Sequence, residues 1–193
     1  DLPQFAYAFT TPGVFIQDDI DVQPWLALSL SGRLDHHSEY GWFLSPRAST
    51  LFRSSNWSVR LSAGSGFFGS TPLTEETEAA GLTRLSLEEP LRAERGRSTS
   101  IDVTRTHGPL TLTTTFFRSR ITSPIHVERS TYTLRNLLEP TTNVGMELLG
   151  TFRQSPFAVT TSYTYVRARE SVRGVSNNVA QTPRHSFGLV GMA

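Results

Sequence analysis

Two adjacent histidines followed by a glutamate are the first side chains in the sequence that could bind a metal ion. His36 and His37 precede Glu39, and imidazole nitrogens and carboxylate oxygens are common metal ligands. The spacing identifies no third ligand, and histidine pairs in polar segments are more often simply solvated. We therefore predict no metal site and no cofactor. His36 and His37, with Tyr40 and Trp42 in the same segment, are predicted to contact a ligand.

Three arginines share the polar side of one predicted hairpin and could bind an anion. Arg47, Arg53 and Arg60 carry guanidinium groups, which form paired hydrogen bonds with carboxylates and phosphates. They could recognise an anionic ligand, or they could be ordinary structural cations paired with neighbouring carboxylates. We take Arg47 and Arg60 as candidate ligand-binding residues. Phe67 and Phe68, where the same hairpin ends, complete the candidate set.

The sequence offers little for catalysis. Gly64-Ser65-Gly66 lacks the Gly-x-Ser-x-Gly spacing of a nucleophile elbow, and no phosphate loop or dinucleotide fingerprint occurs. The chain has no cysteine, which excludes thiol catalysis and disulfide bonds. We predict that the protein is not an enzyme and has no catalytic residues.

The charge of the chain argues against a nucleic-acid partner. The formal net charge is only +1, and the 18 basic residues, all arginine, are spread along the sequence without a dense block.

The candidate arginines and phenylalanines lie on, or directly after, one β-hairpin predicted over Leu44–Phe67. The apolar side of its second arm is Trp57, Val59, Leu61 and Ala63, and the polar side is Ser58, Arg60, Ser62 and Gly64. The first arm sets Leu44, Ala48 and Phe52 against Ser45, Arg47, Ser49 and Arg53. This period of two predicts two β-strands, with Ser54-Ser55-Asn56 as the turn.

Similar alternation along the chain predicts an all-β protein. The further predicted strands cover residues 14–17, 25–35, 98–105, 110–118, 143–152, 157–166 and 185 onward. Residues 36–42, 67–97, 121–140 and 167–183 are predicted loops, and the acidic residues Glu75, Glu76 and Glu78 form a solvated run in the second of them. Antiparallel strands of this kind could build a soluble sandwich with its apolar face inward or a membrane barrel with its apolar face outward.

The lengths of the connections favour the barrel. The turns near Gln23, Ser55, Gly108 and Ser155 are short, whereas the alternating connections near Ser38, Thr83, Glu128 and Ser176 are longer. An up-and-down sheet would place all short turns at one edge and all long loops at the other, which is typical of outer-membrane barrels. A Greek-key sandwich has no reason to sort its loops in this way. No apolar run reaches the roughly 20 residues of a membrane-spanning helix, whereas barrel strands need only about 10.

In their order along the chain, several short motifs resemble the β-barrel region of TonB-dependent outer-membrane receptors. The motifs are Ile16-Gln17-Asp18, Gly32-Arg33-Leu34-Asp35, Ser45-Pro46-Arg47, the strand exit Arg60–Phe67, Glu94 within Leu91–Val103, Asn143-Val144-Gly145-Met146-Glu147 and Thr182-Pro183-Arg184-His185. The likeness covers nearly the whole chain. One departure is the Phe67–Pro72 segment, where haem receptors of this kind often carry Phe-Arg-Ala-Pro, and this argues against haem as the ligand.

The resemblance implies an antiparallel, up-and-down transmembrane β-barrel segment, about nine or ten strands of a larger plugged barrel of roughly 22 strands. Residues 1–193 are then expected to be a partial barrel, with the plug domain and the coupling box absent and C-terminal strands missing. The implied location is the outer membrane of a Gram-negative bacterium.

The function implied by the resemblance is energy-coupled uptake of a scarce nutrient, such as a ferric siderophore, cobalamin or a similar chelate. The expected partners are outer-membrane lipid, the large chelate or another small-molecule ligand, and a TonB-type energy-coupling protein that acts through the missing N-terminal region. The alternative function is an outer-membrane adhesin, or a passive pore or binding module without energy coupling.

Overall fold

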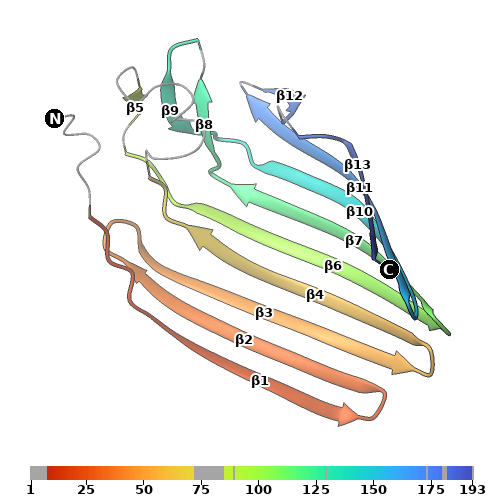
Figure 1. The fold of residues 1–193 in the computed structure, drawn as a ribbon. Helices are drawn as coiled ribbons and strands as arrows, with labels where there is room; N and C mark the ends of the chain where they lie inside the picture. The colour runs from red at the N-terminus through yellow and green to blue at the C-terminus, as the bar shows by residue number, and fades with distance from the viewer. Residues whose placement is uncertain are drawn as a thin grey trace.

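The computed structural model describes residues 8–71, 85–88, 90–128, 130–172, 174–179 and 182–192. These residues form one large antiparallel sheet of ten strands and a separate sheet of three short strands (Figure 1). Within the described ranges, no helix is long and apolar enough to span a membrane. The predicted all-β, antiparallel, up-and-down architecture is confirmed.

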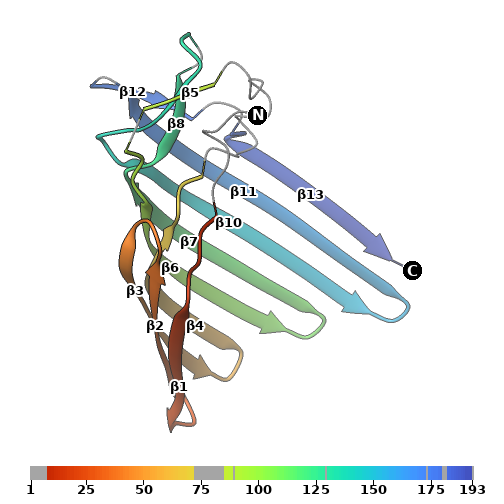
Figure 2. The ribbon, with the colours of Figure 1, turned by 90° about the vertical axis from the view of Figure 1, so that its left-hand side faces the viewer.

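The large sheet follows the order of the chain. Its strands are β1 (Gly13–Gln23), β2 (Leu26–His37), β3 (Gly41–Ser54), β4 (Trp57–Phe68), β6 (Glu94–His107), β7 (Leu110–Thr122), β10 (Thr141–Gln154), β11 (Phe157–Val172), β12 (Val175–Asn178) and β13 (His185–Met192). β12 and β13 both pair with β11, β12 with Arg169–Val172 and β13 with Ala158–Tyr165. They therefore share one edge of the sheet, and the sheet is not closed into a barrel (Figure 2).

The connections are sorted by length between the two ends of the strands (Figure 1). At one end, here the short-turn end, residues 24–25, 55–56, 108–109 and 155–156 each join two strands. In two of these turns, Ser55 and Gly108 take positive φ angles of 42° and 54°, the left-handed conformation that is common in two-residue hairpin turns. At the other end, here the long-loop end, residues 69–93, 123–140 and 173–184 form much longer connections, the last of which contains β12, whereas residues 38–40 join β2 to β3 by a short turn.

All four predicted loops were wrong in their extent. The predicted loop 67–97 contains strand at 67–68, 86–87 and 94–97, and the predicted loop 121–140 contains strand at 121–122, 125–128 and 133–136. Residues 36–42 are not a loop, because β2 runs to His37, β3 starts at Gly41, and the turn takes only residues 38–40. Residues 167–183 also contain strand, since β11 continues to Val172 and β12 follows. In these last two segments the strand continues through polar and charged residues, where the apolar alternation that marks a strand in the sequence has stopped. The acidic run Glu75, Glu76 and Glu78 lies outside the described residues.

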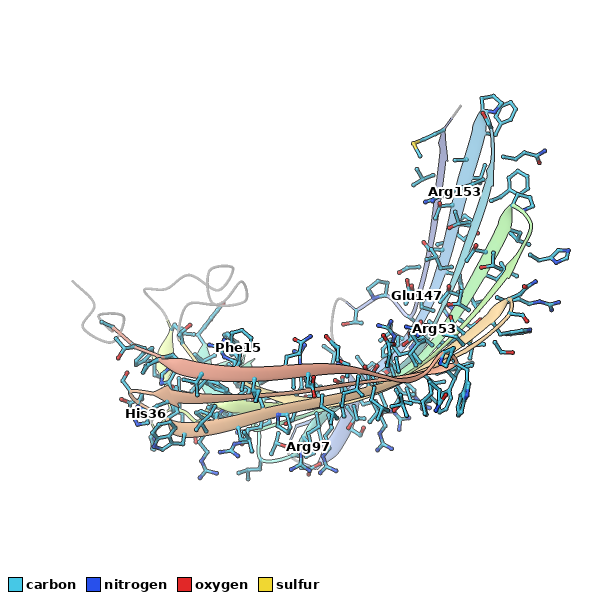
Figure 3. All side chains as sticks on the ribbon, turned by 90° about the horizontal axis from the view of Figure 1, so that it is seen from below. Phe15, His36, Arg53, Arg97, Glu147 and Arg153 are labelled. Carbon is cyan, nitrogen blue, oxygen red and sulfur yellow. The ribbon has the colours of Figure 1, made fainter. Side chains whose placement is uncertain are left out.

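The sheet is curved and its two faces differ in chemistry. Directly paired residues point to the same face, so pairing places Leu30, Ala48, Ala63, Thr99, Arg118, Val144 and Arg167 in one row on one face. Figure 3 shows His36 and Arg97 on the convex side of the sheet, and Phe15 and Glu147 on the concave side. Successive residues of a strand alternate between the faces, so the row from Leu30 to Arg167 lies on the convex face, together with His36 and Arg97.

The convex face carries the apolar half of the alternation. Its exposed side chains include Leu30, Phe52, Leu61, Ile101, Phe116, Leu148 and Phe187, which we call the apolar band. On the concave face, one row across four strands is Ser29, Ser49, Ser62 and Ser100. The hydroxyl of Thr115 donates to Asp102 Oδ1 at 2.7 Å on the same face. The two sides predicted for the Leu44–Phe67 hairpin are confirmed by the pairs Phe52–Val59, Ala48–Ala63 and Arg53–Ser58.

A small hydrophobic core lies at the long-loop end instead of within the sheet. Strands β5 (Ser86–Leu87), β9 (Thr133–Asn136) and β8 (Ile125–Glu128) form the second sheet and bury Leu85, Val127 and Leu134. The side-chain amide of Asn136 accepts from the backbone N–H of Arg92 at 2.7 Å and donates to the carbonyl oxygens of Arg92 and Ser123. Parts of the connections 69–93 and 123–140, namely residues 85–88 and 90–93 of the first and 123–128 and 130–140 of the second, thus pack against each other.

Candidate functional site

A cluster of aromatic side chains lies at the long-loop end, where the β2–β3 turn meets the exit of β4. We call Phe9, His37, Tyr40, Phe43 and Phe67 the mouth cluster. The ring centroids are 4.9 Å apart for Phe9 and His37, 4.8 Å for His37 and Tyr40, and 6.5 Å for His37 and Phe67. Three segments separated in sequence therefore converge on the ring of His37.

His37 is the centre of this cluster and is only 5% exposed. Its Nδ1 accepts from the backbone N–H groups of Glu39 at 3.2 Å and Tyr40 at 3.3 Å, which closes the three-residue turn. A Cβ at Gly69 would lie 2.6 Å from His37 Nε2, so the chain can pass over the imidazole only because residue 69 has no side chain. The ring of His37 is thus fixed by backbone on two sides.

Tyr40 ties the turn to the loop that follows β4. Its hydroxyl donates to the carbonyl oxygen of Ser70 at 2.8 Å, and the Ser70 hydroxyl donates to the carbonyl oxygen of Arg92 at 2.6 Å. Burial raises the pKa of Tyr40, and the nearby charge of Glu39 raises this pKa further. The phenol therefore stays protonated and keeps donating to Ser70.

Phe43 and Phe67 fill a gap between two strands. The pairing of β3 with β4 ends at Arg47–Gly64, and beyond this point the two rings stack with centroids 3.9 Å apart and planes 5° apart. The guanidinium carbon of Arg95 lies 4.9 Å from the Phe43 ring centroid, a cation–π contact. The rings replace the missing backbone pairing.

A polar hollow of ≈ 540 Å³ lies below the mouth cluster and is lined by Phe15, Gln17, Arg33, Asp35 and Arg47 among others. Arg33 Nε donates to both carboxylate oxygens of Asp35, at 2.8 and 2.9 Å, so the charge of Arg33 is matched. Arg47 lies across Gly64, where a Cβ would be 2.9 Å from Arg47 Cγ.

Arg47 and Arg60 are two cations of the concave face that remain available. Both side chains point to the concave side, because Arg47 is paired with Ser31 and Arg60 with Asp102 in the register. Within the described part of the chain, neither forms an ion pair with a carboxylate. Their guanidinium groups can therefore bind an anion on the concave side without first breaking a salt bridge.

The structure brings only part of the predicted site together. His37, Tyr40 and Phe67 belong to the mouth cluster, and Arg47 lines the hollow beneath it. Arg60 lies on the same concave face, closer to the short-turn end. The contact of all these residues with a ligand stays a prediction.

The other three predicted residues lie away from the cluster. His36 and Trp42 are a pair on the convex face with ring centroids 4.7 Å apart, and Phe68 is exposed at the end of β4. Successive residues of a strand point to opposite faces, so His36 and His37 cannot bind one metal ion together. Within the described ranges, no three His, Asp or Glu residues are grouped to hold a metal ion.

Sequence reasoning did not include Phe9, Phe43, Arg33 or Asp35 among the candidate site residues, although Arg33 and Asp35 belong to a motif of the family resemblance. Phe43 does leave a signal, because it is an aromatic residue on the polar side of β3, in line with Ser45 and Arg47. The spacing of Arg33 and Asp35, two residues apart in a predicted strand, also places both on one face. Phe9 precedes the first strand, where no periodicity indicates its position.

Comparison with known proteins identifies the fold. The family model described as TonB dependent receptor-like, beta-barrel, matches residues 3–193. No curated protein matches the chain. Among solved structures, the siderophore receptor PirA from Acinetobacter baumannii shares 12% identity, with a TM-score of 0.76 over 97% of this chain and 32% of that one. PirA from Pseudomonas aeruginosa shares 16% identity, with a TM-score of 0.69 over 83% of this chain and 34% of that one.

The ferripyoverdine receptor of the outer membrane of Pseudomonas aeruginosa is also similar, with 14% identity and a TM-score of 0.72 over 95% of this chain and 26% of that one. The chain thus spans between about a quarter and a third of the length of these structures. At these identities the structures establish the fold, and the match to the family model over residues 3–193 establishes the family. The chain belongs to the TonB-dependent receptor-like β-barrel family.

Proposed function

We propose that this chain is part of the wall of an outer-membrane, energy-coupled receptor that takes up a ferric siderophore or a similar chelate. The observation that supports it most is the division of the curved sheet, with the apolar band on the convex face and serine, threonine and arginine side chains on the concave face. A barrel wall in a bilayer needs this division, with lipid outside and a polar lumen inside. Residues 1–193 are then a portion of the barrel, and the plug domain and coupling region belong to other parts of the full-length receptor.

The names of the similar receptors support the substrate class. PirA is named as a siderophore receptor and the third protein as a ferripyoverdine receptor. In this chain, the mouth cluster offers aromatic surfaces at the long-loop end, and Arg47 and Arg60 offer cations on the concave side. An anionic ferric chelate would pack against the rings and then meet the guanidinium groups on its path inward.

Uptake of an iron-loaded chelate tests this function. The full-length receptor is produced in a Gram-negative strain that lacks its own siderophore receptors, and cell-associated radioactive iron is measured for a panel of ferric siderophores. We expect accumulation of at least one chelate, and we expect it to stop when the TonB-type coupling protein is deleted. The matched control is the same strain carrying an empty vector.

The two alternatives give different results in the same assay. A passive pore would admit small solutes equally well with and without the coupling protein. An adhesin would produce no chelate accumulation in either strain but would make the cells bind to surfaces. Either pattern would contradict the proposed transport function.

A further inference from the structure

The convex face carries five arginines close together towards the long-loop end. They are Arg97 on β6, Arg118 and Arg120 on β7, and Arg167 and Arg169 on β11, and we call them the convex arginine patch. Arg97 pairs directly with Arg120, and through Thr142 on β10 the same row reaches Arg169. The next row towards the short-turn end contains Arg118, Val144 and Arg167. All five are exposed.

These charges lack an anionic partner among the residues that the structure describes. Within the described ranges, none of the five forms an ion pair with a carboxylate. Two of the nearby acids point to the other face: Asp102 accepts from Thr115, and Glu170 pairs with His126 Nδ1 at 3.5 Å. Glu139 lines a hollow with Arg167 and Arg169, and Asp18 lines another with Arg97, but neither carboxylate forms an ion pair with these arginines in the described part of the chain. Like charges placed directly opposite each other in a sheet are unfavourable, so the Arg97–Arg120 pair needs an external anion.

The position of the patch along the strands indicates the kind of anion. On β7 the convex residues change from Leu112 and Phe116 of the apolar zone to Arg118 and Arg120 within two positions. On β11 the change is from Tyr163 and Tyr165 to Arg167. In a membrane barrel this boundary is the level of the lipid head groups, whose phosphates are the anions at that depth.

A hollow on the same face extends from the patch into the apolar zone. It has a volume of ≈ 740 Å³, and its lining includes Ile16, Leu30, Pro46, Ala48 and Ala63, with two charged residues, Asp18 and Arg97. Small side chains on adjacent strands, such as the paired Ala48 and Ala63, leave this space open. Arg97 belongs both to the hollow and to the patch, so the charged and the apolar surfaces are continuous.

We propose that the patch and the hollow together bind a phosphorylated glycolipid of the outer leaflet, the lipopolysaccharide of Gram-negative bacteria. Guanidinium groups bind phosphate oxygens in pairs, and the patch covers three strand-to-strand steps, about 15 Å, which suits a head group with more than one phosphate. An acyl chain of the same lipid lies in the hollow beside Arg97. The proposal rests on the proposed outer-membrane location but not on transport.

Lipid retained by the purified full-length receptor tests the proposal. The variant combines Arg97→Gln, Arg120→Gln and Arg169→Gln, and the matched control is Arg105→Gln. Arg105 lies on the same strand and face as Arg97 but at the short-turn end, where its guanidinium carbon is 5.0 Å from the Trp57 ring centroid. After detergent extraction, native mass spectrometry and a phosphate assay give the lipopolysaccharide bound per protein.

We expect the triple variant to lose lipopolysaccharide affinity by about tenfold or more, since three charge-assisted contacts are removed, while Arg105→Gln keeps it. Equal retention by the triple variant and the wild type would overturn the proposal. The triple variant could fail to fold, which the loss of its heat-dependent gel shift would show. In that case the test is the affinity of the wild-type protein for two lipids. The wild type must bind lipopolysaccharide at least about tenfold more tightly than the same lipid with its phosphates removed, and equal binding of the two would reject phosphate recognition.

The outcome is separable from that of the transport proposal. A receptor that binds the lipid through the patch but takes up no chelate would contradict only the proposed transport. A receptor that transports a chelate but binds both lipids equally would contradict only the lipid site.

Discussion

Replacing Leu148 by arginine is expected to destabilise the full-length receptor by about 2–4 kcal/mol, the cost of placing this charge near the bilayer midplane on the lipid face of a barrel. Leu148 is a member of the apolar band on β10 and is 40% exposed. The adjacent Leu149 has almost the same exposure, 38%, but points to the concave face. Leu149→Arg is therefore a control with the same residue types, the same strand and a different neighbouring medium.

The readout is unfolding of both variants and the wild type in lipid vesicles, followed by tryptophan fluorescence in increasing denaturant. We expect Leu149→Arg to change the free energy of unfolding little, because its guanidinium enters a polar, water-accessible lumen. Equal destabilisation by the two substitutions would contradict a lipid-facing convex surface. Greater destabilisation by Leu149→Arg would reverse the assignment of the two faces.

Gly145→Ala is the second substitution with a large expected effect. Gly145 is buried in β10, and a Cβ there would lie 2.5 Å from the carbonyl oxygen of Tyr165 and against the ring of Phe117. The ring can rotate away, but the carbonyl oxygen belongs to the backbone of β11 and can move only with the strand. We expect a loss of about 1–3 kcal/mol, the usual cost of overpacking.

Gly96→Ala is the matched control, because Gly96 lies in β6 and a Cβ there would meet no atom within 4 Å. The midpoint temperature of the heat-dependent gel shift is measured for each variant. We expect it to fall for Gly145→Ala and to stay unchanged for Gly96→Ala. Adding Phe117→Leu to Gly145→Ala should restore only part of the loss, since the Tyr165 carbonyl remains. An unchanged midpoint for Gly145→Ala would show that β10 and β11 are not packed as described.

The sequence predicts the faces of the sheet well because they follow from a local rule. Alternation in Trp57–Ala63 assigns each side chain to a face, and Ser54-Ser55-Asn56 marks the turn, so the hairpin was predicted correctly without tertiary information. The glycine in Asn143–Glu147 entered only as part of a motif, and its close approach to Tyr165 explains why that motif needs glycine.

The parts that sequence reasoning missed depend on long-range contacts or on strands that continue without apolar alternation. β5, β8 and β9 are two to four residues long, and their joint core of Leu85, Val127 and Leu134 comes from two different connections. The extension of β11 through Arg167 and Arg169 carries charge where a periodic strand is expected to be apolar. For the same reason, the sequence did not show that His36 and His37 point to opposite faces: they were predicted to lie in a loop, whereas β2 includes both residues.

Successive residues of one strand are expected to face lipid and lumen in turn, and cysteine scanning in the middle of β10 examines this alternation. This chain has no cysteine, so single cysteines at positions 146–149 of the full-length receptor carry a nitroxide spin label without background from this region. Collision rates with oxygen, which dissolves in lipid, and with a water-soluble nickel chelate are measured in lipid vesicles. We expect high oxygen collision at 146 and 148 and high nickel collision at 147 and 149. Uniform access of the nickel chelate to all four positions would contradict a barrel wall with one face in lipid.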